Sequence, residues 1–576
     1  MSFRIKNYLK QIREAETGAQ IYPPGLRHPV AFVYPNVYHL GMSNLGMHIL
    51  YQMINARGDS ACERFFLPDK SMLREHITSR TPLLSIENGK PLADFAVIFV
   101  MLSFEMDYEN LMTILDLGHI KLRAAERNAK EPLVIIGGPC ATFNPEPLAQ
   151  VADAFVIGEG ELTVQRILDV VYEESTKEAR LSKLANLAGV YVPKYYHPQY
   201  VIDENTGTEK YLGLIPDASV PKKIARQWLK EIDNTPHTSA IVTDGTEFED
   251  MFIVETARGC GRHCRFCMAG YCFRKPRNRD LKNIIADIEK RPARTKKVGL
   301  MGAAVSDHPQ IDELVAYLSE NKINFSIASL RADRLNSQLA NALASCGQRT
   351  MTVAPEAGSE RMRAAINKGI TENHIYTACE LAAEAGMQNI KLYYMIGLPG
   401  EEDIDIEETV KMILRVRKKM DEAGNKGELV VSVNGFVPKP FTPYQWSPLC
   451  NVRTLKQRFK MLNDGLKKNR KIKLITESLK ETVIQSILAR GDRKMGEYLL
   501  EAHEKQLQLK QVLKANGVDA EQLAETPLQV GSVLPWSHLD MGVTEAYLIN
   551  ELRNSNEGRF TPMCFDNCHR CGVCKL

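Results

Sequence analysis

The chain has 576 residues, of which 44% are hydrophobic and 25% charged, and its formal net charge is +3. The length predicts about three domains, and the near-neutral balance excludes a chain built as a polycation. No run of residues approaches the ~18 consecutive apolar positions that a membrane span needs. Residues 1–20 show a charged amphipathic helix pattern without the apolar core of a signal peptide. We therefore expect a cytoplasmic protein without a membrane span.

Residues 21–190 alternate strand and helix patterns. Four apolar runs predict buried strands, at 30–36, 95–103, 133–139 and 154–161. Near-continuous apolar strands alternating with helices predict a doubly wound, Rossmann-type parallel sheet covered on both faces. Glycines follow several of these strands, at the edge where open α/β sheets bind ligands. The sequence therefore predicts an α/β ligand-binding domain.

The same alternation returns after a connecting segment at 191–245. Six strand patterns predict a complete or partial TIM-type barrel over 246–445, at 252–257, 297–304, 324–331, 349–356, 389–397 and 429–438. Ligands of such barrels lie at the C-terminal ends of the strands. We predict a mainly helical, basic region over 446–560, with 16 Lys and Arg against 8 Asp and Glu in 451–520. That charge suits a solvated face or an RNA substrate, and a Cys-rich tail follows at 561–576.

Seven of the thirteen cysteines fall into two groups, which indicates metal ligands and not disulfides in a chain of this kind. The first group, Cys260, Cys264 and Cys267, has the spacing C-x3-C-x2-C directly after the first barrel strand. Thiolates on a short loop suit a 4Fe–4S cluster, and three of them leave one iron open for a substrate or cofactor. Phe266 adds an apolar cover. The alternative is a zinc site that takes a fourth ligand from elsewhere.

The second group lies in the tail, where Cys564, Cys568, Cys571 and Cys574 have the spacing C-x3-C-x2-C-x2-C. Four thiolates so close together can saturate one 4Fe–4S cluster or one zinc ion. The tight C-x2-C-x2-C spacing favours the cluster, for electron relay or substrate ligation. Structural zinc and a disordered redox-active tail are the alternatives.

The three-cysteine loop after a first barrel strand resembles the radical S-adenosylmethionine (SAM) superfamily. The resemblance implies that the amino and carboxylate groups of SAM chelate the fourth iron. An electron from the cluster then yields methionine and a 5′-deoxyadenosyl radical. The stretches "MAG" after the third cysteine, "APEAGSERMRAAINKG" and "IGLPGE" are similar to the family's SAM contacts. The positions implied are Ala269, Gly270, Glu356, Ser359, Arg361 and Gly397. Alternatively, Ser359 caps a helix and Gly397 is a turn glycine.

The first domain, placed before such a barrel, resembles the cobalamin-binding domain of cobalamin-dependent radical SAM enzymes. The matching stretches are "YPNVYHLGMSNLG", "LSFEMDYEN", "IIGGPCATFNPEPL" and "DAFVIGEGE". The resemblance implies cofactor contacts at Gly41, Ser103, Gly137, Gly138, Gly158 and Glu159. Many such domains use Asp-x-His-x-x-Gly, whose His is the lower cobalt ligand, whereas this chain has Tyr38 at the His position. Strand alternation sends the adjacent His39 to the other side. Either cobalamin binds without a protein imidazole, or the domain is a scaffold that has lost it.

The whole chain is most similar to an uncharacterised family of cobalamin-type radical SAM proteins. "FVPKPFTPYQW", "RGDRK" and the terminal "CGVC" carry that resemblance. It implies a methyltransferase that acts on an unactivated carbon, fed by an electron donor such as flavodoxin or ferredoxin. The alternatives are a radical SAM reaction without methyl transfer, such as rearrangement or methylthiolation, and a non-catalytic iron–sulfur module. The substrate, whether a small molecule, peptide or RNA, and the oligomeric state have no signature in the sequence.

Overall fold

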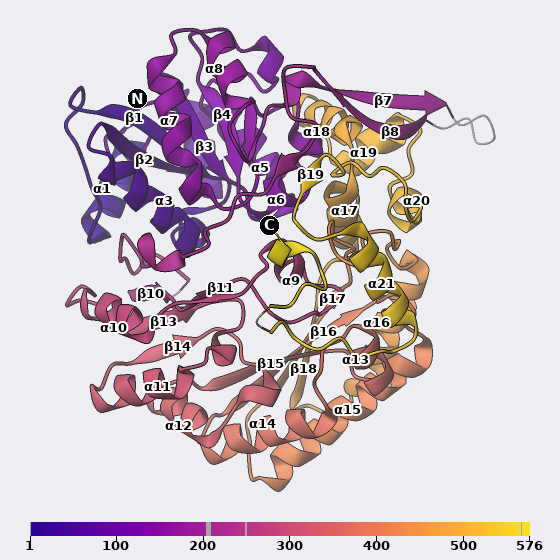
Figure 1. Cartoon of the computed structure of the whole chain (residues 1–576). Helices are drawn as coiled ribbons and strands as arrows, with labels where there is room; N and C mark the ends of the chain where they lie inside the picture. Colours follow the sequence, from indigo (N-terminus) through magenta and orange to yellow (C-terminus); the bar gives the residue numbers. More distant parts are fainter. Residues whose placement is uncertain (1, 203–208, 248–249, 566, 576) are drawn as a thin grey trace.

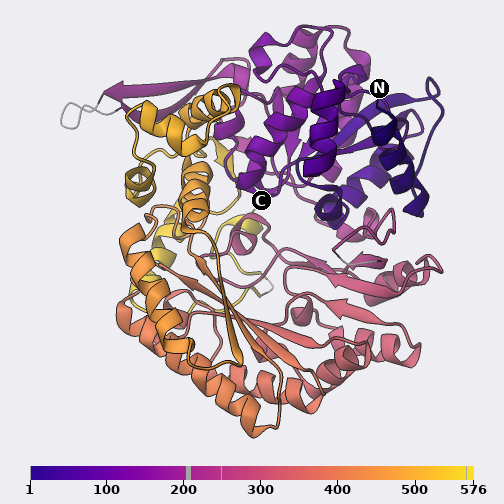
Figure 2. The same cartoon turned by 180° about the vertical axis from the view of Figure 1, so that it is seen from behind.

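The structure is a computed structural model that describes residues 2–202, 209–247, 250–565 and 567–575. An N-terminal α/β unit and an open barrel face one another, and C-terminal helices pack along one side of both (Figures 1 and 2). Residues 561–565 and 567–575 run back to the centre of the molecule, between the two units (Figure 1). This arrangement confirms the predicted fold class, an α/β chain with a sheet domain, a barrel and a mainly helical C-terminal region.

The N-terminal unit is built on a doubly wound sheet. Its strands are β1 (His28–Tyr34), β2 (Ser60–Phe66), β3 (Val97–Met101), β4 (Leu133–Gly137), β5 (Ala154–Val156) and β6 (Val190–Tyr191). Its helices are α1 (Phe3–Ala15), α2 (Tyr38–Gly41), α3 (Leu45–Ala56), α4 (Lys70–Ser79), α5 (Tyr108–Leu117), α6 (Pro139–Phe143), α7 (Val164–Glu173) and α8 (Lys177–Leu184). The strand order in the described chain is β2-β1-β3-β4-β5-β6, with β1 to β5 parallel. This order reverses between β1 and β3, where such sheets bind ligands.

Alternate residues of the central strands face different helices. Val30 and Phe32 of β1 belong to the core that contains α3 and α7, whereas Ala31 and Val33 belong to the core that contains α5. This period of two explains why the strands read as continuous apolar runs. Strand β2 had no such signal, because its sequence SACERFF places Glu63 in a fully buried run.

The barrel consists of parallel strands in two hydrogen-bonded groups. They are β10 (Met251–Glu255), β13 (Lys297–Met301), β14 (Phe325–Ile327), β15 (Thr350–Glu356), β16 (Asn389–Ile396), β17 (Leu429–Gly435) and β18 (Ile472–Thr476). A parallel bridge between Leu330 and Val353 joins the groups β10-β13-β14 and β15-β16-β17-β18. In the described chain β10 and β18 form the two edges, so the barrel is partial. The sequence did not indicate β18, because IKLIT stands in a lysine-rich stretch.

Helices cover the outer face of the barrel (Figure 2). They are α10 (Leu281–Glu289), α11 (Ile311–Glu320), α12 (Ser337–Ser345), α13 (Glu360–Ala365), α14 (Glu372–Glu384), α15 (Asp403–Glu422) and α16 (Val452–Leu466). Five further helices follow β18 or the segments after it: α17 (Leu479–Arg490), α18 (Arg493–Glu504), α19 (Leu509–Ala515), α20 (Ala520–Glu525) and α21 (Glu545–Asn556). No helix of the described residues is long and apolar enough to cross a membrane.

The segment between the two units is more ordered than the sequence suggested. Its hairpin of β7 (Tyr196–Ile202) and β8 (Glu209–Pro216) projects from the body of the molecule (Figure 1). Its next strand, β9 (Ile224–Ala225), pairs in parallel with β19 (Leu539–Asp540). The connecting segment is therefore tied to the C-terminal region.

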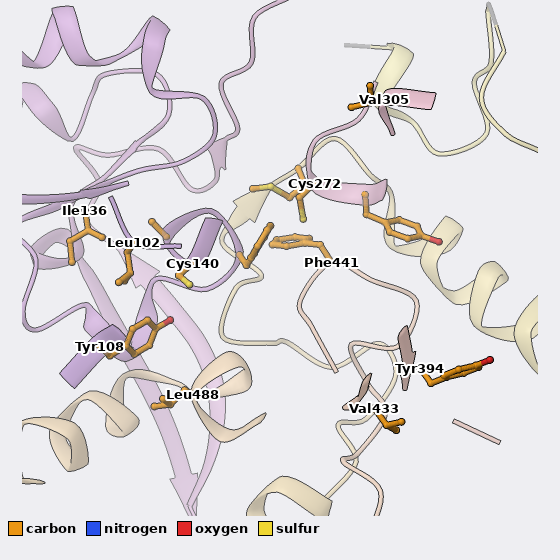
Figure 3. Close-up of a cluster of buried hydrophobic side chains, with 14 of the residues drawn as sticks. Leu102, Tyr108, Ile136, Cys140, Cys272, Val305, Tyr394, Val433, Phe441 and Leu488 are labelled. Carbon is orange, nitrogen blue, oxygen red and sulfur yellow. The ribbon is translucent and has the colours of Figure 1, made fainter. Parts of the chain in front are cut away.

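One hydrophobic core runs through the units. Figure 3 shows Tyr108 and Cys140 of the N-terminal unit, Phe441 and Val433 of the barrel and Leu488 of α17 within the same set of buried side chains. Polar contacts reinforce this junction. Asn144 donates from Nδ2 to the carbonyl oxygen of Gly491 at 2.7 Å, and Arg493 donates from Nε to a carboxylate oxygen of Glu146 at 3.0 Å. The "RGDRK" stretch therefore joins the C-terminal helices to the first sheet.

Candidate functional site

The three-cysteine loop begins at the C-terminal end of β10, at the barrel mouth. The short hairpin of β11 (Ala257–Arg258) and β12 (Arg277–Asn278) closes its base, and α9 (Ala269–Cys272) follows the third cysteine. The N–H of Cys267 donates to the carbonyl oxygen of Cys264 at 3.1 Å, and the N–H of Gly270 donates to that of Cys267 at 3.2 Å. The backbone that carries Ala269 and Gly270 therefore folds directly against the thiol-bearing turn.

The three thiols share one electrostatic environment. Burial first, and then the charges of Cys264 and Cys260, raise the pKa of Cys267 to about 12. Thiolates in such a place require a compensating cation, and metal ligation supplies it. The donor set fits a 4Fe–4S cluster, in which each thiolate binds a different iron. Among the described residues no group of three or more His, Cys, Asp or Glu side chains converges on a single metal ion.

A buried charge network anchors the N-terminal end of this loop. Arg258, two residues before the first cysteine, donates from Nε to Glu255 at 2.8 Å and from one terminal nitrogen to Glu161 at 2.6 Å. His237 donates from Nδ1 to the other oxygen of Glu255 at 2.8 Å. Although burial opposes the charge, hydrogen bonds from His237 and Arg258 lower the pKa of Glu255 to about 2. Glu255 is therefore ionised at neutral pH and holds Arg258 in place.

The middle of the loop is anchored to neighbouring barrel loops. Arg262 donates two hydrogen bonds to the carboxylate of Asp307, at 2.7 and 2.9 Å, and lies 3.6 Å from a carboxylate oxygen of Asp333. Bidentate pairing of this kind fixes orientation as well as position. Neither Arg258 nor Arg262 belongs to the site residues predicted from the sequence. The available signal was their interleaving with the cysteines in "ARGCGRHCRFC", since buried arginines need acidic partners.

The tail folds back onto the same loop, a point that the sequence left open. The N–H of Cys564 donates to the carbonyl oxygen of Gly261 at 2.8 Å. Arg265, fully buried, donates to the Glu551 carboxylate at 3.1 Å and to the carbonyl oxygen of Arg559 at 2.6 Å. The hydroxyl of Thr561 donates to Glu551 at 2.8 Å. The two cysteine groups are therefore neighbours, although almost 300 residues separate them in sequence.

His263 stands between the two groups. Its Nε2 lies 3.6 Å from Sγ of Cys564, and its Nδ1 lies 3.0 Å from a terminal nitrogen of Arg274 and also contacts the hydroxyl of Tyr547. Burial first, and then the charge of Arg274, lowers the pKa of His263 to about 2. Arg274 has only hydrogen-bond donors, and the same terminal nitrogen lies 3.0 Å from Nδ1 and 3.4 Å from Nε2, so the ring accepts from Arg274 while Nε2 also faces the cysteine.

Two of the residues expected to contact SAM meet at the barrel mouth. Glu356 has a left-handed backbone (φ +69°), and its carboxylate lies 3.1 Å from the ammonium of Lys368. That ammonium also lies 5.9 Å from the centre of the Phe266 ring. The structure therefore brings Phe266 and Glu356 together through a lysine that the sequence analysis did not single out.

The other expected SAM contacts have protein partners instead. Ser359 accepts from the Met362 N–H at 3.1 Å, so it caps α13, and it donates to Asp405 at 2.6 Å. Arg361 pairs with the same Asp405 and is half exposed. Gly397 has φ +84°, and its N–H donates to a carboxylate oxygen of Glu401 at 2.6 Å. These contacts support the alternatives, a helix cap for Ser359 and a turn glycine for Gly397, and they pair Arg361 of α13 with Asp405 of α15. A contact of these residues with SAM stays a prediction.

A cavity of about 410 Å³ lies between the C-terminal edge of the first sheet and the barrel. Its deep part is apolar and includes Phe32 and Phe99, and its barrel side is formed by Glu255, Arg258 and Met301. Because Arg258 immediately precedes the cysteine loop, the cavity adjoins that loop. Of the residues expected to bind cobalamin, four line it: Gly137, Gly138, Gly158 and Glu159.

Two of these glycines have different roles. A Cβ added at Gly137 would meet Val156 at 3.7 Å, an ordinary contact, so this position opens onto the cavity. A Cβ added at Gly158 would lie 2.1 Å from the carbonyl oxygen of Gln227, so Gly158 permits the close approach of the connecting segment. Glu159 receives two hydrogen bonds from Arg277, at 2.6 and 2.9 Å. Its charge is therefore held at the cavity rim.

Tyr38, at the position of the usual His, and Gly41 lie outside the lining of this cavity, so their assignment to the cofactor site stays a prediction. The Tyr38 hydroxyl donates to Glu16 at 2.6 Å, and a Cβ at Gly41 would lie 2.3 Å from the ring of Phe66. Neither is among the described residues that line the cavity. The loop turns both toward Phe66 because tight packing there requires a glycine. Ser103 is also outside this lining, but its Oγ accepts from Asn44, which belongs to it, at 3.4 Å.

Two family signatures match the chain. The signature for radical SAM proteins, N-terminal, covers residues 46–193, and that of the radical SAM superfamily covers residues 254–413. The first match falls on the doubly wound sheet. The second begins within β10, contains the three-cysteine loop and ends in α15.

Curated relatives extend over more of the chain. An uncharacterised protein of Methanocaldococcus jannaschii is 31% identical over 472 residues, which is 82% of this chain and 90% of that protein. An uncharacterised methyltransferase of Pyrococcus horikoshii is 25% identical over 50% of this chain and 58% of its own length. A second M. jannaschii protein, assigned by name to the methylthiotransferases, is 23% identical over 48% of this chain and 56% of its own length.

Among solved structures, the cobalamin-dependent S-adenosylmethionine radical enzyme OxsB is similar at a TM-score of 0.47 and 14% identity, covering 92% of this chain and 79% of that one. A partial barrel with three cysteines on the loop after its first strand defines a class of iron–sulfur enzyme. The family matches make the class specific: the chain belongs to the radical SAM superfamily and is an enzyme of that class.

Proposed function

We propose that the protein is a cobalamin-dependent radical SAM methyltransferase that acts on an unactivated carbon. The observation that carries the proposal is the cavity of about 410 Å³ that the first sheet and the barrel share, since it adjoins the three-cysteine loop. A relative named as a methyltransferase supports methyl transfer. The substrate is a small molecule, peptide or RNA that reaches the same barrel mouth.

The thiolates of Cys260, Cys264 and Cys267 hold the catalytic 4Fe–4S cluster in this proposal. When SAM and cobalamin are bound, they supply the carbon radical and the transferred methyl group. The backbone of Ala269 and Gly270 lies beside the third thiolate and contacts the SAM amino group. Glu356 and Lys368 offer a fixed pair of opposite charges at the mouth, which orients polar groups of SAM without further desolvation.

The first sheet holds cobalamin. Gly137 leaves room at the strand end for the corrin, and the apolar floor around Phe32 and Phe99 accepts the dimethylbenzimidazole tail. Because Tyr38 faces Glu16 and His39 lies 3.5 Å from a carboxylate oxygen of Glu247, both are engaged away from the cavity. We therefore propose that no protein imidazole binds the cobalt.

We further propose that Cys564, Cys568, Cys571 and Cys574 hold a second 4Fe–4S cluster. Burial first, and then the charges of Cys571 and Cys568, raise the pKa of both Cys564 and Cys574, so the two middle cysteines lie near both ends of the group. In tetrahedral zinc sites the sulfurs stand about 3.8 Å apart, since each zinc–sulfur bond is about 2.3 Å. A cubane separates its thiolates further, because each binds a different iron. Metal analysis distinguishes this cluster from a zinc ion bound by the same four cysteines.

A radical SAM methylthiotransferase is the second candidate, favoured by the relative assigned to that class. The cysteines of the described chain are free of disulfides, which suits a reducing compartment, and we propose the cytoplasm.

Anaerobically purified protein tests the main proposal. Metal analysis and the visible spectrum should report iron and cobalt together. With SAM and reductant, methyl transfer yields both S-adenosylhomocysteine and 5′-deoxyadenosine. Gly137→Leu should fill the cavity and remove cobalt while leaving iron in place, and Ser182→Leu on the exposed face of α8 is the control. Full cobalt content in Gly137→Leu would contradict the assigned site, and 5′-deoxyadenosine without S-adenosylhomocysteine would favour a reaction without cobalamin methylation.

A further inference from the structure

We infer that the tail is the port through which electrons enter the enzyme. Its cluster accepts one electron from a low-potential, acidic electron-transfer protein and passes it to the cluster on the 260–267 loop. This inference rests on the proposed second cluster and adds its role, its direction and the class of partner.

The four tail cysteines form a path from the catalytic loop to the surface. Cys564 lies at the end of this path next to the catalytic loop. Its N–H donates to the carbonyl oxygen of Gly261, and a Cβ added at Gly261 would lie 3.5 Å from the Cβ of Cys564. Cys568 and Cys571 are buried, and Cys574 is exposed. A cluster on these ligands touches the catalytic loop on one side and solvent on the other. Those are the two positions that a relay between an external donor and the catalytic cluster requires.

The number of cysteine ligands decides whether the tail cluster relays electrons or binds a substrate. Four cysteines occupy all four irons of a cubane, so such a cluster offers no open iron to a substrate. A cluster on the loop of three cysteines retains one open iron. The tail cluster therefore exchanges electrons and does not ligate substrate.

Hydrogen bonds to the tail sulfurs suit an electron acceptor. Nε2 of His263 lies 3.6 Å from Sγ of Cys564, and Arg570 donates from Nε to Sγ of Cys568 at 3.2 Å. Donors to cluster sulfurs stabilise the reduced, more negative state. Because His263 directly precedes Cys264, a single residue lies between the ligands of both clusters. His263 thus provides one connection between the clusters, and the backbone bond from Cys564 to Gly261 provides another.

The surface around the tail fits one kind of partner. Phe560, Met563 and Phe565 are exposed by 68%, 40% and 62%. The exposed Arg559 and Lys275 are basic and lie on segments next to the tail, although Nε of Arg559 also pairs with Glu557 at 2.7 Å. Arg570 stacks 5.4 Å above the Phe565 ring. An apolar patch with basic neighbours complements an acidic protein surface. We commit to a one-electron donor protein with an acidic face, such as a flavodoxin or ferredoxin.

The transfer balances with one electron. The reduced donor loses one electron, and the tail cluster passes from the 2+ to the 1+ state. The tail cluster returns to 2+ as the catalytic cluster becomes 1+. That electron enters SAM and breaks its bond between sulfur and the 5′ carbon, which leaves methionine and the 5′-deoxyadenosyl radical. No proton moves in these steps.

The test compares two reductants on one pair of variants. Dithionite is a small chemical reductant that can reach either cluster, whereas flavodoxin with its reductase must dock. In Cys568→Ala/Cys574→Ala, iron should fall from about eight to about four per chain, since each cysteine group holds one cubane. SAM cleavage with dithionite should persist, and cleavage with flavodoxin should fall to the donor-free background. Cys346→Ala/Cys450→Ala, outside both groups, is the matched control.

A readout independent of SAM chemistry separates this inference from the proposed function. In Cys260→Ala/Cys264→Ala/Cys267→Ala only the tail cluster remains, and reduced flavodoxin should still bleach its visible absorption. In the double tail variant, flavodoxin should leave the remaining cluster oxidised while dithionite reduces it. If flavodoxin reduced that remaining cluster at the wild-type rate, electrons would not enter through the tail and the inference would be wrong. Wild-type protein with four irons and one zinc would overturn the tail cluster itself.

Charge reversal tests the partner. Arg559→Glu should raise the KM for flavodoxin about tenfold, in line with the cost of a like-charge contact at an interface rim. Only the backbone carbonyl of Arg559 contacts Arg265, so the substitution leaves that buried bond in place. Activity with dithionite should not change, and Lys456→Glu on the exposed side of α16 is the control. An unchanged KM would show that the donor docks elsewhere.

Discussion

The two cysteine groups meet in space but are held in different ways. The 260–267 loop is fixed at several points by barrel side chains, with Arg258 on Glu255 and Arg262 on Asp307. The tail is fixed mainly through contacts to that loop and to α21, such as Cys564 to Gly261 and Thr561 to Glu551. The group with three ligands is thus part of a rigid barrel, and the group with four covers it. Reactive chemistry needs the first arrangement, and electron transfer tolerates the second.

The largest expected effect comes from removing the loop thiols. Cys260→Ala/Cys264→Ala/Cys267→Ala should abolish 5′-deoxyadenosine formation and lower iron by about four per chain, because the SAM-binding iron lies in this cluster. Chromatography of the products and iron analysis measure both. Cys346→Ala should retain wild-type values. SAM cleavage that survives in the triple variant would erase the distinction between the two groups.

The next effect tests the anchor of the loop. The carboxyl of Glu255 has a pKa near 2 in the folded protein, against the ordinary value of 4.5 in the unfolded chain. Its ionised form therefore stabilises the fold above about pH 4.5. That contribution is lost as pH falls from about 4.5 toward 2. Glu255→Gln should lower the free energy of unfolding of the apoprotein at pH 7 by on the order of 3 kcal/mol, and should flatten its dependence on acid pH.

Urea unfolding at pH 7, 5 and 3 measures this effect. Glu320→Gln, on the exposed side of α11, is the control and should follow the wild type. If Glu255→Gln and wild type lose stability in parallel between pH 5 and 3, the ionised Glu255 is not what anchors the loop.

A smaller effect is expected at the anchor of the tail. Thr561→Val removes the hydroxyl that donates to Glu551 and leaves that buried carboxylate with one fewer partner. The cost should be about 1–3 kcal/mol, the penalty for a buried polar group that loses a hydrogen bond. Hydrogen exchange should increase in residues 561–575 and stay unchanged in the loop. Thr526→Val, at an exposed helix end, is the control, and equal exchange in both variants would place the tail's anchor elsewhere.

The last prediction is that His39→Ala leaves the spectrum of bound cobalamin unchanged. Cob(II)alamin bound to the protein should show no nitrogen superhyperfine splitting from a protein imidazole in its paramagnetic resonance spectrum, and His39→Ala should leave that spectrum unchanged. The physical reason is that His39 contacts Glu247 and Tyr38 contacts Glu16. Protein-derived splitting that disappears in His39→Ala would show that this loop rearranges when cobalamin binds.

The sequence predicted what local patterns encode. The apolar runs that became β1, β3 and β4, and the loop with Cys260 to Cys267, carry their signals within a few residues. Strands with interrupted patterns escaped notice. Glu63 lies in β2 and Lys473 in β18, and pairing with neighbouring strands accounts for each strand better than its own sequence does.

Long-range contacts account for the rest of the site. Nothing near Arg258 or Arg265 indicates Glu161 or Glu551 as a partner, because ion pairs between distant segments have no periodicity. The same reason kept the tail's position open. That Tyr38 and Gly41 lie outside the cavity lining had no signal in the sequence, because a short motif fixes the residue types of a loop but not the direction in which the loop turns.

The return of the tail to the catalytic loop has a consequence for how the protein is made. About 300 residues separate Cys267 from Cys564, so at typical rates of synthesis the loop leaves the ribosome about 15–60 s before the tail. During that interval the side of the loop around Gly261 and His263 has no cover from Cys564. An iron–sulfur carrier that loads the loop then works on a surface that the finished enzyme no longer presents.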